Sequence, residues 1–316
     1  MRRFLLALLC STLLPAAWAN TSTLTVPMTA ERVGKHSYFV QGLPGAASSA
    51  NQGFMSNAGF VVTCDGVVVF DALASPPLAA KLVDQIRTIT NQPIKRVIVS
   101  HYHADHYYGL QVFKALGAEV WTHRASEGTT RSKEAADRFS QRKEALFPWV
   151  DDTTRLLEAD VFLEGDTDFE MGGIHFSLRH VGPAHSSEDL VMMVKEDGVL
   201  YAGDLVFRGR VPFVGDADSR AWIAALDTLI ALDSRVLIPG HGAPSLTPQT
   251  DLVFTRDYLK FIRKAMGQAA RDLVPFDEAY AATDWSKYRD MPAFNEANRV
   301  NAYNQYLRLE QEGMAE

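Results

Sequence analysis

Residues 96–106, RVIVSHYHADH, decide how this chain folds and what it can bind. After Arg96 come three β-branched apolar residues in a row, Val97, Ile98 and Val99, which predict a strand covered on both faces. Four potential metal ligands follow within six residues: His101, His103, Asp105 and His106. A turn at the end of a strand can direct alternate side chains toward two neighbouring points. Because imidazole and carboxylate groups suit zinc, the stretch predicts part of a metal site.

Three more candidate ligands lie downstream, each after an apolar run and beside or close to a glycine. His185 follows Gly-Pro-Ala, Asp204 follows a glycine, and His241 lies between two glycines. Polar side chains in such loops can converge on one edge of a sheet, which is the usual site of function in α/β architectures. One metal needs three or four ligands, so the whole set is large enough for two.

The rest of the chain alternates strand and helix patterns. Residues 53–71 predict a hairpin that turns at Asp65-Gly66, and Ser75 followed by Pro76 predicts the start of a helix. Its buried stripe is expected to be Leu78, Leu82, Val83, Ile86 and Ile89. Further strands are expected at 174–181, 190–194, 199–202 and 236–238, and further helices at about 109–116 and 218–232.

This alternation predicts a layered α/β domain over residues 20–249. Beyond residue 250, apolar residues recur at helical spacing, so residues 250–316 are expected to form a helical C-terminal extension. The 316 residues are 47% hydrophobic and 22% charged, with a net charge of −7, which is ordinary for a globular protein. Nothing in this balance indicates binding to nucleic acid.

The N-terminus predicts an export signal over residues 1–19. Arg2 and Arg3 precede a short apolar run, and Ala17-Trp18-Ala19 is a small-x-small cleavage site. We therefore expect cleavage near Ala19, a periplasmic location, and no membrane span in the mature form. Cleavage would leave Cys64, which we expect in the core, as the only cysteine, so no internal disulfide is expected.

At these residues the chain resembles the metallo-β-lactamase superfamily, over about residues 50–245. The motifs occur in order: Asp71 ending a valine-rich strand, the run from His101 to His106, then the three downstream ligands. The resemblance implies an αββα sandwich that holds two zinc ions, with iron or manganese as other metals. It implies that His101, His103 and His185 hold the first metal, that Asp105, His106 and His241 hold the second, and that Asp204 bridges both.

The resemblance also implies the roles of residues around the metals. Asp71 is expected to form a hydrogen bond near a metal ligand. Two cations about 3.5–4 Å apart can activate a water and polarise a scissile carbonyl, and Asp105 is expected to orient that water as well as to bind metal. Tyr107 and Tyr108 either line a substrate pocket or pack at the start of the next helix.

Differences within the superfamily narrow the expected reaction. The commonest secreted β-lactamase subclass has a cysteine where Asp204 stands and an arginine where His106 stands, and another subclass lacks the bridging aspartate. The full ligand set looks like the glyoxalase II-like branch, which contains hydroxyacylglutathione hydrolases, and like related esterases, lactonases and thioesterases. The export signal, SHYHADH and the ending NAYNQYL (301–307) look closest to exported zinc metallohydrolases associated with quinoprotein systems and sulfur oxidation.

The sequence therefore predicts a zinc hydrolase that cleaves an ester, thioester or lactone of a small molecule. The first alternative is β-lactam hydrolysis. The second is an iron-dependent redox enzyme on the same fold, and the third is a binding factor that uses zinc structurally. The sequence makes no prediction of oligomeric state.

Overall fold

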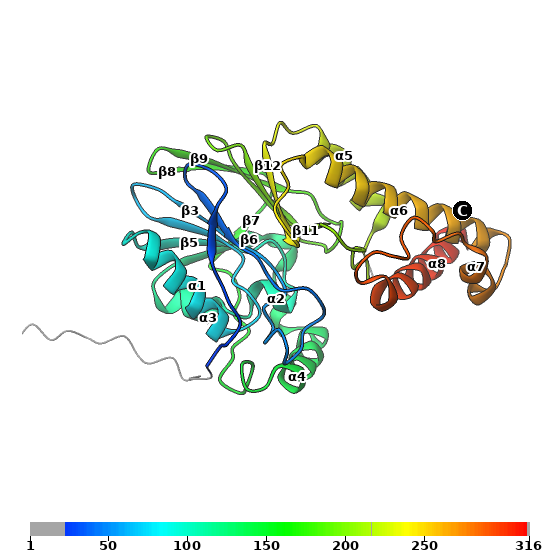
Figure 1. Ribbon diagram of the computed structural model, residues 1–316, viewed down its shortest axis with the longest axis horizontal. Coiled ribbons are helices and arrows are strands. Elements are labelled where there is room, and N and C mark those ends of the chain that lie inside the picture. The colour runs from blue at the N-terminus through cyan, green and yellow to red at the C-terminus, as the bar shows by residue number, and fades with distance from the viewer. Residues whose placement is uncertain (1–22, 216, 315–316) are drawn as a thin grey trace, which may run out of the picture.

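Two β-sheets pack face to face at the centre of the molecule, and helices cover the outer face of each (Figure 1). The computed structural model describes residues 23–215 and 217–314. This αββα arrangement, followed by C-terminal helices, confirms the fold class expected from the sequence. The predicted signal peptide over residues 1–19 lies outside the described residues.

The first sheet has seven strands in the order β1 to β7. Strands β1 to β4 run antiparallel to their neighbours, whereas β4 to β7 run parallel. The hairpin of β3 and β4 confirms the turn predicted at Asp65-Gly66. The strands are β1 (Ala30–Arg32), β2 (Ser37–Val40), β3 (Ala58–Val62), β4 (Val67–Phe70), β5 (Ile94–Ile98), β6 (Glu119–His123) and β7 (Val161–Leu163).

The second sheet has five strands in the order β12-β11-β10-β9-β8. Only β11 and β12 run parallel within it. The sequence did not predict β8, because this edge strand buries none of its side chains fully. The strands are β8 (Thr167–Met171), β9 (Ile174–His180), β10 (Leu190–Val194), β11 (Val199–Phe207) and β12 (Val236–His241).

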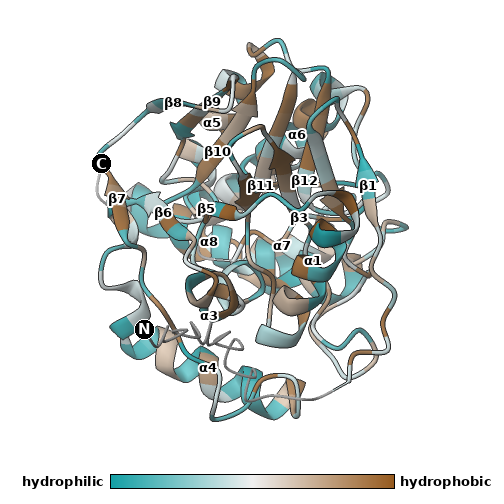
Figure 2. Cartoon of the chain, turned by 90° about the vertical axis from the view of Figure 1, so that its left-hand side faces the viewer, coloured by the Kyte–Doolittle hydropathy of each residue, from teal (hydrophilic) through white to brown (hydrophobic). Residues whose placement is uncertain are grey.

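The unbroken apolar runs follow from this layering, because side chains alternate between the two faces of a strand. In β4, Val67 and Val69 join the core beneath the helices. Val68 and Phe70 join the core between the two sheets. Every residue of β4 is therefore buried, and Figure 2 shows β10, β11 and β12 similarly in the hydrophobic colours.

The helices beside the first sheet begin with α1 (Pro76–Ile89), whose predicted cap is confirmed: Ser75 Oγ accepts a hydrogen bond from the Leu78 amide over 3.3 Å. Its buried stripe stops at Ile86; Ile89, the last helical residue, is 37% exposed, which corrects the prediction. Cys64 lies beyond the end of β3 and is exposed, so its expected core position was wrong. The other elements up to residue 230 are α2 (Ala104–Tyr107), α3 (Leu110–Ala115), short 3₁₀ turns at Arg124–Ser126 and Thr129–Arg131, α4 (Lys133–Leu146) and α5 (Ser219–Ile230).

The C-terminal helices extend to one side of the sandwich (Figure 1). The first half of α6 (Pro248–Arg271) packs with α5 on the outer face of the second sheet, and its second half packs against α7 (Phe276–Ala282) and α8 (Arg299–Met314). A π-helical turn at Phe294–Asn298 precedes α8. None of the helices that the structure describes has the length and apolar composition needed to cross a bilayer.

Candidate metal centre

All seven predicted ligands meet at one end of the sandwich, where the parallel strands of both sheets end. The stretch after β5 carries four of them, and the second sheet and its loops carry the other three. Because the carboxyl ends of parallel strands share an edge, residues far apart in sequence converge there. His101 and His103 follow β5, Asp105 and His106 lie in α2, His185 lies between β9 and β10, Asp204 lies in β11, and His241 ends β12.

The first cluster contains His101, His103, His185 and Asp204, whose ligand atoms all lie within 4.8 Å of one another. His103 Nδ1 is 3.0 Å from His101 Nε2 and 2.9 Å from His185 Nε2. A neutral imidazole carries a single N–H, so three converging nitrogens cannot all satisfy one another. One cation at about 2.0–2.1 Å from each nitrogen would use all three lone pairs.

The second cluster contains Asp105, His106 and His241, again with ligand atoms within 4.8 Å of one another. Asp105 Oδ2 lies 3.4 Å from His241 Nε2 and 3.6 Å from His106 Nε2. His106 is fully buried, and its Nε2 has no hydrogen-bond partner in the part of the chain that the structure describes. A buried nitrogen without a hydrogen-bond partner destabilises the folded protein. A metal ion bound to His106 Nε2 would provide the missing partner.

Asp204 joins the two clusters with one oxygen directed at each. Its Oδ2 lies 3.4 Å from His185 Nε2 and 3.8 Å from His101 Nε2. Its Oδ1 lies 3.2 Å from His106 Nε2 and 3.3 Å from His241 Nε2. Within the described residues Oδ1 forms no hydrogen bond. The donor set therefore fits a pair of cations that share this carboxylate.

Asp71 orients one ligand of each cluster. It accepts a hydrogen bond from His106 Nδ1 over 2.8 Å, which leaves Nε2 of that ring directed toward the second cluster. It also accepts bonds from the Ser100 amide (2.7 Å) and hydroxyl (2.9 Å), and Ser100 Oγ lies 2.9 Å from His101 Nδ1. Such partners fix the ring orientation and tautomer of metal-binding histidines. The sequence pattern did not identify Ser100, although it directly precedes the first ligand.

Residues 55–57, just before β3, support the site from the other side and were not predicted. The Met55 carbonyl accepts a hydrogen bond from His241 Nδ1 over 2.7 Å. Ser56 Oγ donates to the Asp105 carbonyl over 2.5 Å. Asn57 Nδ2 donates to the Pro239 and Gly242 carbonyls, each over 2.8 Å. These contacts tie the loop around His241 to the helix that carries Asp105.

The two clusters hold protons differently in the metal-free protein. Burial lowers the pKa of His185 to about 4, and it also lowers the pKa of His101 and His103. Burial alone would lower the pKa of His241 as well, but Asp204 and Asp105 raise it to about 9. The three histidines of the first cluster are therefore neutral and ready to bind metal at pH 7, whereas His106 and His241 of the second cluster carry positive charge.

The two carboxylate ligands stay ionised despite their burial. Burial alone would raise the pKa of Asp204, but His241 and His106 bring it well below its usual value. The pKa of Asp105 is lowered in the same way, against its own burial, by His106 and His241. Both groups can therefore act as anionic oxygen ligands over the whole physiological pH range.

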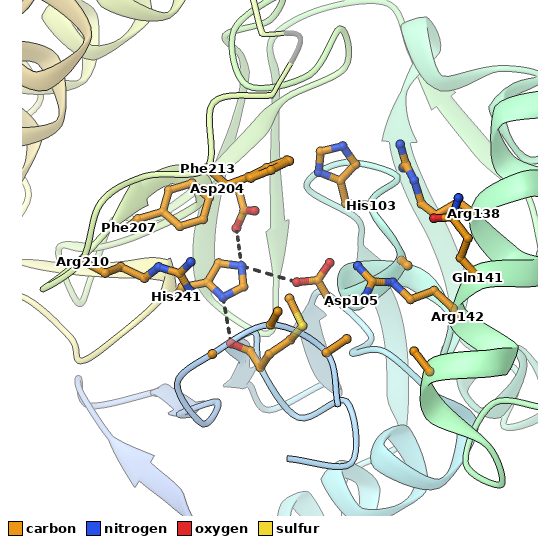
Figure 3. Close-up of a pocket in the computed structure, with 16 residues that line it drawn as sticks. His103, Asp105, Arg138, Gln141, Arg142, Asp204, Phe207, Arg210, Phe213 and His241 are labelled. Carbon is orange, nitrogen blue, oxygen red and sulfur yellow. Dashed lines mark hydrogen bonds and ion pairs between the residues drawn. The ribbon is translucent and has the colours of Figure 1, made fainter. Parts of the chain in front are cut away.

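A cavity of about 470 Å³ opens onto both clusters. Asp105, Asp204 and His241 lie at its centre, and α4 forms one wall, as Figure 3 shows. The remaining labelled wall residues are His103, Arg138, Gln141, Arg142, Phe207, Arg210 and Phe213. Such a volume suits a small-molecule ligand.

Tyr107 and Tyr108 are not among the residues that line this cavity. They are 2% and 0% exposed and belong to the core beneath the first sheet. Tyr108 contacts Phe139 of α4 edge to face, with ring centroids 5.8 Å apart. Of the two roles considered from the sequence, the structure therefore places them in the packing role.

The comparison with protein families agrees with this geometry. The model of the Metallo-beta-lactamase superfamily matches residues 51–241, a range that contains Asp71 and all seven ligands. The chain is 22% identical over 209 residues to a metallo-beta-lactamase type 2 from Elizabethkingia meningoseptica, covering 65% of this chain and 76% of that one. It is also 22% identical over 213 residues to a linear primary-alkylsulfatase from Pseudomonas sp. (strain ATCC 19151). That match covers 57% of this chain but only 40% of the alkylsulfatase.

Solved structures share the fold. A metallo-beta-lactamase from Pontibacter korlensis has a TM-score of 0.59 at 20% identity, over 74% of this chain and 99% of that one. A stereoselective inverting sec-alkylsulfatase from Pseudomonas sp. has a TM-score of 0.73 at 17% identity, over 89% of this chain and 50% of that one. Since the family model spans both ligand clusters and Asp71, the chain belongs to the metallo-beta-lactamase superfamily and is a hydrolase of that fold with a dinuclear type of His/Asp metal site.

Proposed function

We propose that the protein uses two zinc ions to hydrolyse an ester, thioester or lactone of a small molecule. The observation that carries this proposal is the position of Asp204, whose two oxygens each face one cluster at the base of the cavity. His, Asp and a shared carboxylate suit zinc. When bound, the metals supply acidification of a water molecule and polarisation of the scissile carbonyl.

The protein's own residues supply the remaining parts of the reaction. Asp105 lines the cavity and stays ionised, so it can accept a hydrogen bond from the attacking water and orient it toward the substrate. Asp71, Ser100 and Met55 hold the imidazole rings in fixed orientations. Phe207 and Phe213 provide apolar walls that exclude water from the substrate's body.

The test is a substrate panel on protein whose metal content has been measured. The panel contains a carboxyl ester, a thioester, a lactone, an alkyl sulfate and the chromogenic β-lactam nitrocefin. Zinc-dependent turnover of one of the first three, lost on chelation and restored by zinc, supports the proposal. The His103→Ala variant should lose activity together with bound metal and should melt at a lower temperature; wild-type turnover by it would refute the ligand assignment.

Hydrolysis of β-lactams is the second candidate, and the likeness to the Elizabethkingia and Pontibacter metallo-beta-lactamases favours it. Fast zinc-dependent turnover of nitrocefin would rank it first. Alkyl sulfates belong in the panel because two relatives are alkylsulfatases. Bound iron with oxygen uptake would instead indicate redox chemistry on this fold. Export to the periplasm stays a proposal from the N-terminal sequence, and N-terminal sequencing of the mature protein tests it.

A further inference from the structure

Three arginine side chains line the cavity, on opposite sides of the metal ligands. Arg138 and Arg142 are four residues apart on α4, so they share one face of that helix. Arg210 follows β11 and lies on the opposite side of the ligands (Figure 3). All three side chains are half-buried. The cavity is therefore flanked by three fixed positive charges, since arginine stays protonated in proteins.

These guanidinium groups have no acidic partner among the residues that the structure describes. Across residues 23–215 and 217–314, no carboxylate oxygen lies within 4.0 Å of Arg138, Arg142 or Arg210. Arg138 Nη1 donates a long bond, 3.4 Å, to the Tyr102 carbonyl, and Arg210 Nε donates one of 3.4 Å to the Val211 carbonyl. Other arginines of the chain do form ion pairs. The pairs are Arg131 with Glu158, Arg179 with Asp168, Arg256 with Asp227 and Arg308 with Asp218.

The carboxylates in the cavity do not remove the need for a counter-ion. The two that line it, Asp105 and Asp204, are both ligands in the proposed site, where bound cations would neutralise them. Half-buried guanidinium groups without an acidic partner then favour an anion from solution, and they bind planar oxygen anions through paired N–H groups. A neutral substrate would leave these charges uncompensated when it displaced water from the cavity.

We propose that the substrate carries an anionic oxygen group, such as a carboxylate or sulfonate, separate from the bond that is hydrolysed, and that Arg138 and Arg142 bind this group. The proposal rests on the proposed function, because it assigns the substrate class of that site. The reacting carbonyl lies at the metal ligands, and the anion lies toward α4. Arg210, on the far wall, adds to the positive potential that attracts the substrate.

The test compares three acetyl esters: 4-acetoxybenzoate, its methyl ester and 4-acetoxybenzenesulfonate. The methyl ester is the neutral match, and it has the better leaving group of the two benzoate compounds, which biases the comparison against the proposal. Wild-type, zinc-loaded protein should show a kcat/KM on the order of tenfold higher for 4-acetoxybenzoate than for its methyl ester, since charged hydrogen bonds have this effect. If the sulfonate is favoured as well, the site accepts any oxygen anion. If only the benzoate is favoured, the site requires a planar carboxylate.

Arg142→Gln is the principal variant, because among the described residues no hydrogen bond or ion pair joins Arg142 to the stretch that carries the ligands, whereas Arg138 donates to the Tyr102 carbonyl. It should lower the preference for the anionic ester about tenfold, mainly through KM, with unchanged metal content. Arg142→Lys keeps the charge but loses the planar fork, so it should restore part of the preference. Lys143→Gln is the matched control: it removes a charge from the same helix, but Lys143 pairs with Asp152 outside the cavity.

Equal kcat/KM for the anionic and methyl esters in the wild type would overturn the inference while leaving ester hydrolysis intact. An unchanged preference in both Arg142→Gln and Arg138→Gln would also overturn it. If none of the esters is cleaved, the failure concerns the proposed reaction, and calorimetry decides the anion site separately. Binding of 4-acetoxybenzoate that is weakened in Arg142→Gln but not in Lys143→Gln supports the site; equal binding by all three proteins, or none, refutes it.

Discussion

Asp71 and His106 form a buried pair in which the carboxylate accepts a hydrogen bond from Nδ1 over 2.8 Å, while Nε2 of the same ring lies 3.2 Å from the shared carboxylate of Asp204. Asp71 adopts a left-handed backbone conformation, with φ of 65°, directly after β4. This conformation is unusual for a residue with a side chain. In this conformation the Asp71 carboxylate also accepts hydrogen bonds from the amide and hydroxyl of Ser100. Because Ser100 Oγ in turn lies 2.9 Å from His101 Nδ1, Asp71 links the end of β4 to both metal clusters.

Replacing Asp71 by Asn should weaken metal binding at the second cluster by about 10–100-fold, because the amide cannot fix the His106 ring as the carboxylate does. Competition with a chromophoric chelator measures the affinity of each site. Asp84→Asn on the exposed side of α1 is the control and should bind as the wild type does. Equal affinities for Asp71→Asn and Asp84→Asn would show that the pair has no part in orienting the ligand.

The two clusters should take up metal in a fixed order as the pH rises. Burial lowers the pKa of His185 to about 4, so the first cluster is already deprotonated at pH 6. His241, whose pKa its carboxylate neighbours raise to about 9 against its burial, must lose a proton before it can bind. Zinc titration at pH 6 should therefore give one tight site and at pH 8.5 two. Calorimetry in buffers of different ionisation enthalpy should detect proton release only for the second ion; two tight sites at pH 6 would contradict this order.

The metal-free protein should lose stability in the alkaline range. The pKa of His241 is about 9 in the folded protein against 6.5 for an ordinary histidine. Its contribution to the free energy of unfolding is therefore complete below pH 6.5 and is lost as the pH rises through about 9. Urea unfolding of the metal-free protein from pH 6 to pH 9.5 measures this loss. His241→Gln should flatten the profile, and an unchanged alkaline loss of stability in this variant would contradict the assignment to His241.

Gly240→Ala should disrupt the metal site by displacing the carboxylate of Asp204. A Cβ at this position would overlap Asp204 Oδ1, the oxygen that faces the second cluster. The carboxylate would have to move, so we expect loss of the second metal and of activity, and a cost of about 1–3 kcal/mol from overpacking. Gly165→Ala is the control, since nothing lies within 4 Å of its added carbon. Metal analysis and thermal melting of both variants test this, and full zinc content in Gly240→Ala would be the opposing result.

Much of this arrangement could be predicted because the ligands lie in short motifs that can be recognised in the sequence. His101 to His106 lie within six residues, and the downstream ligands follow apolar runs. The valine-rich β4 and the Ser75-Pro76 cap also depend on local rules of burial and hydrogen bonding. Each of these features is a short-range consequence of residue type, so the sequence displays it directly.

The parts that were missed depend on contacts between distant segments. Arg138 and Arg142 have helical spacing, but α4 contains many other charged residues, and only the fold shows which of them face the cavity. Asn57 reaches the Pro239 and Gly242 carbonyls across more than 180 residues. The Met55 carbonyl could not be predicted as a hydrogen-bond acceptor, because every residue has a backbone carbonyl.

Each ligand cluster takes members from both sheets, and neither sheet with its loops carries three ligands of the same cluster. A half-built chain, ending before β8, could not retain an ion tightly at either position. The metal content of a preparation should therefore measure the fraction of molecules whose two halves have come together. In the cell, the same dependence would make metal capture the last event of maturation, after which the two halves could part only by releasing their ions.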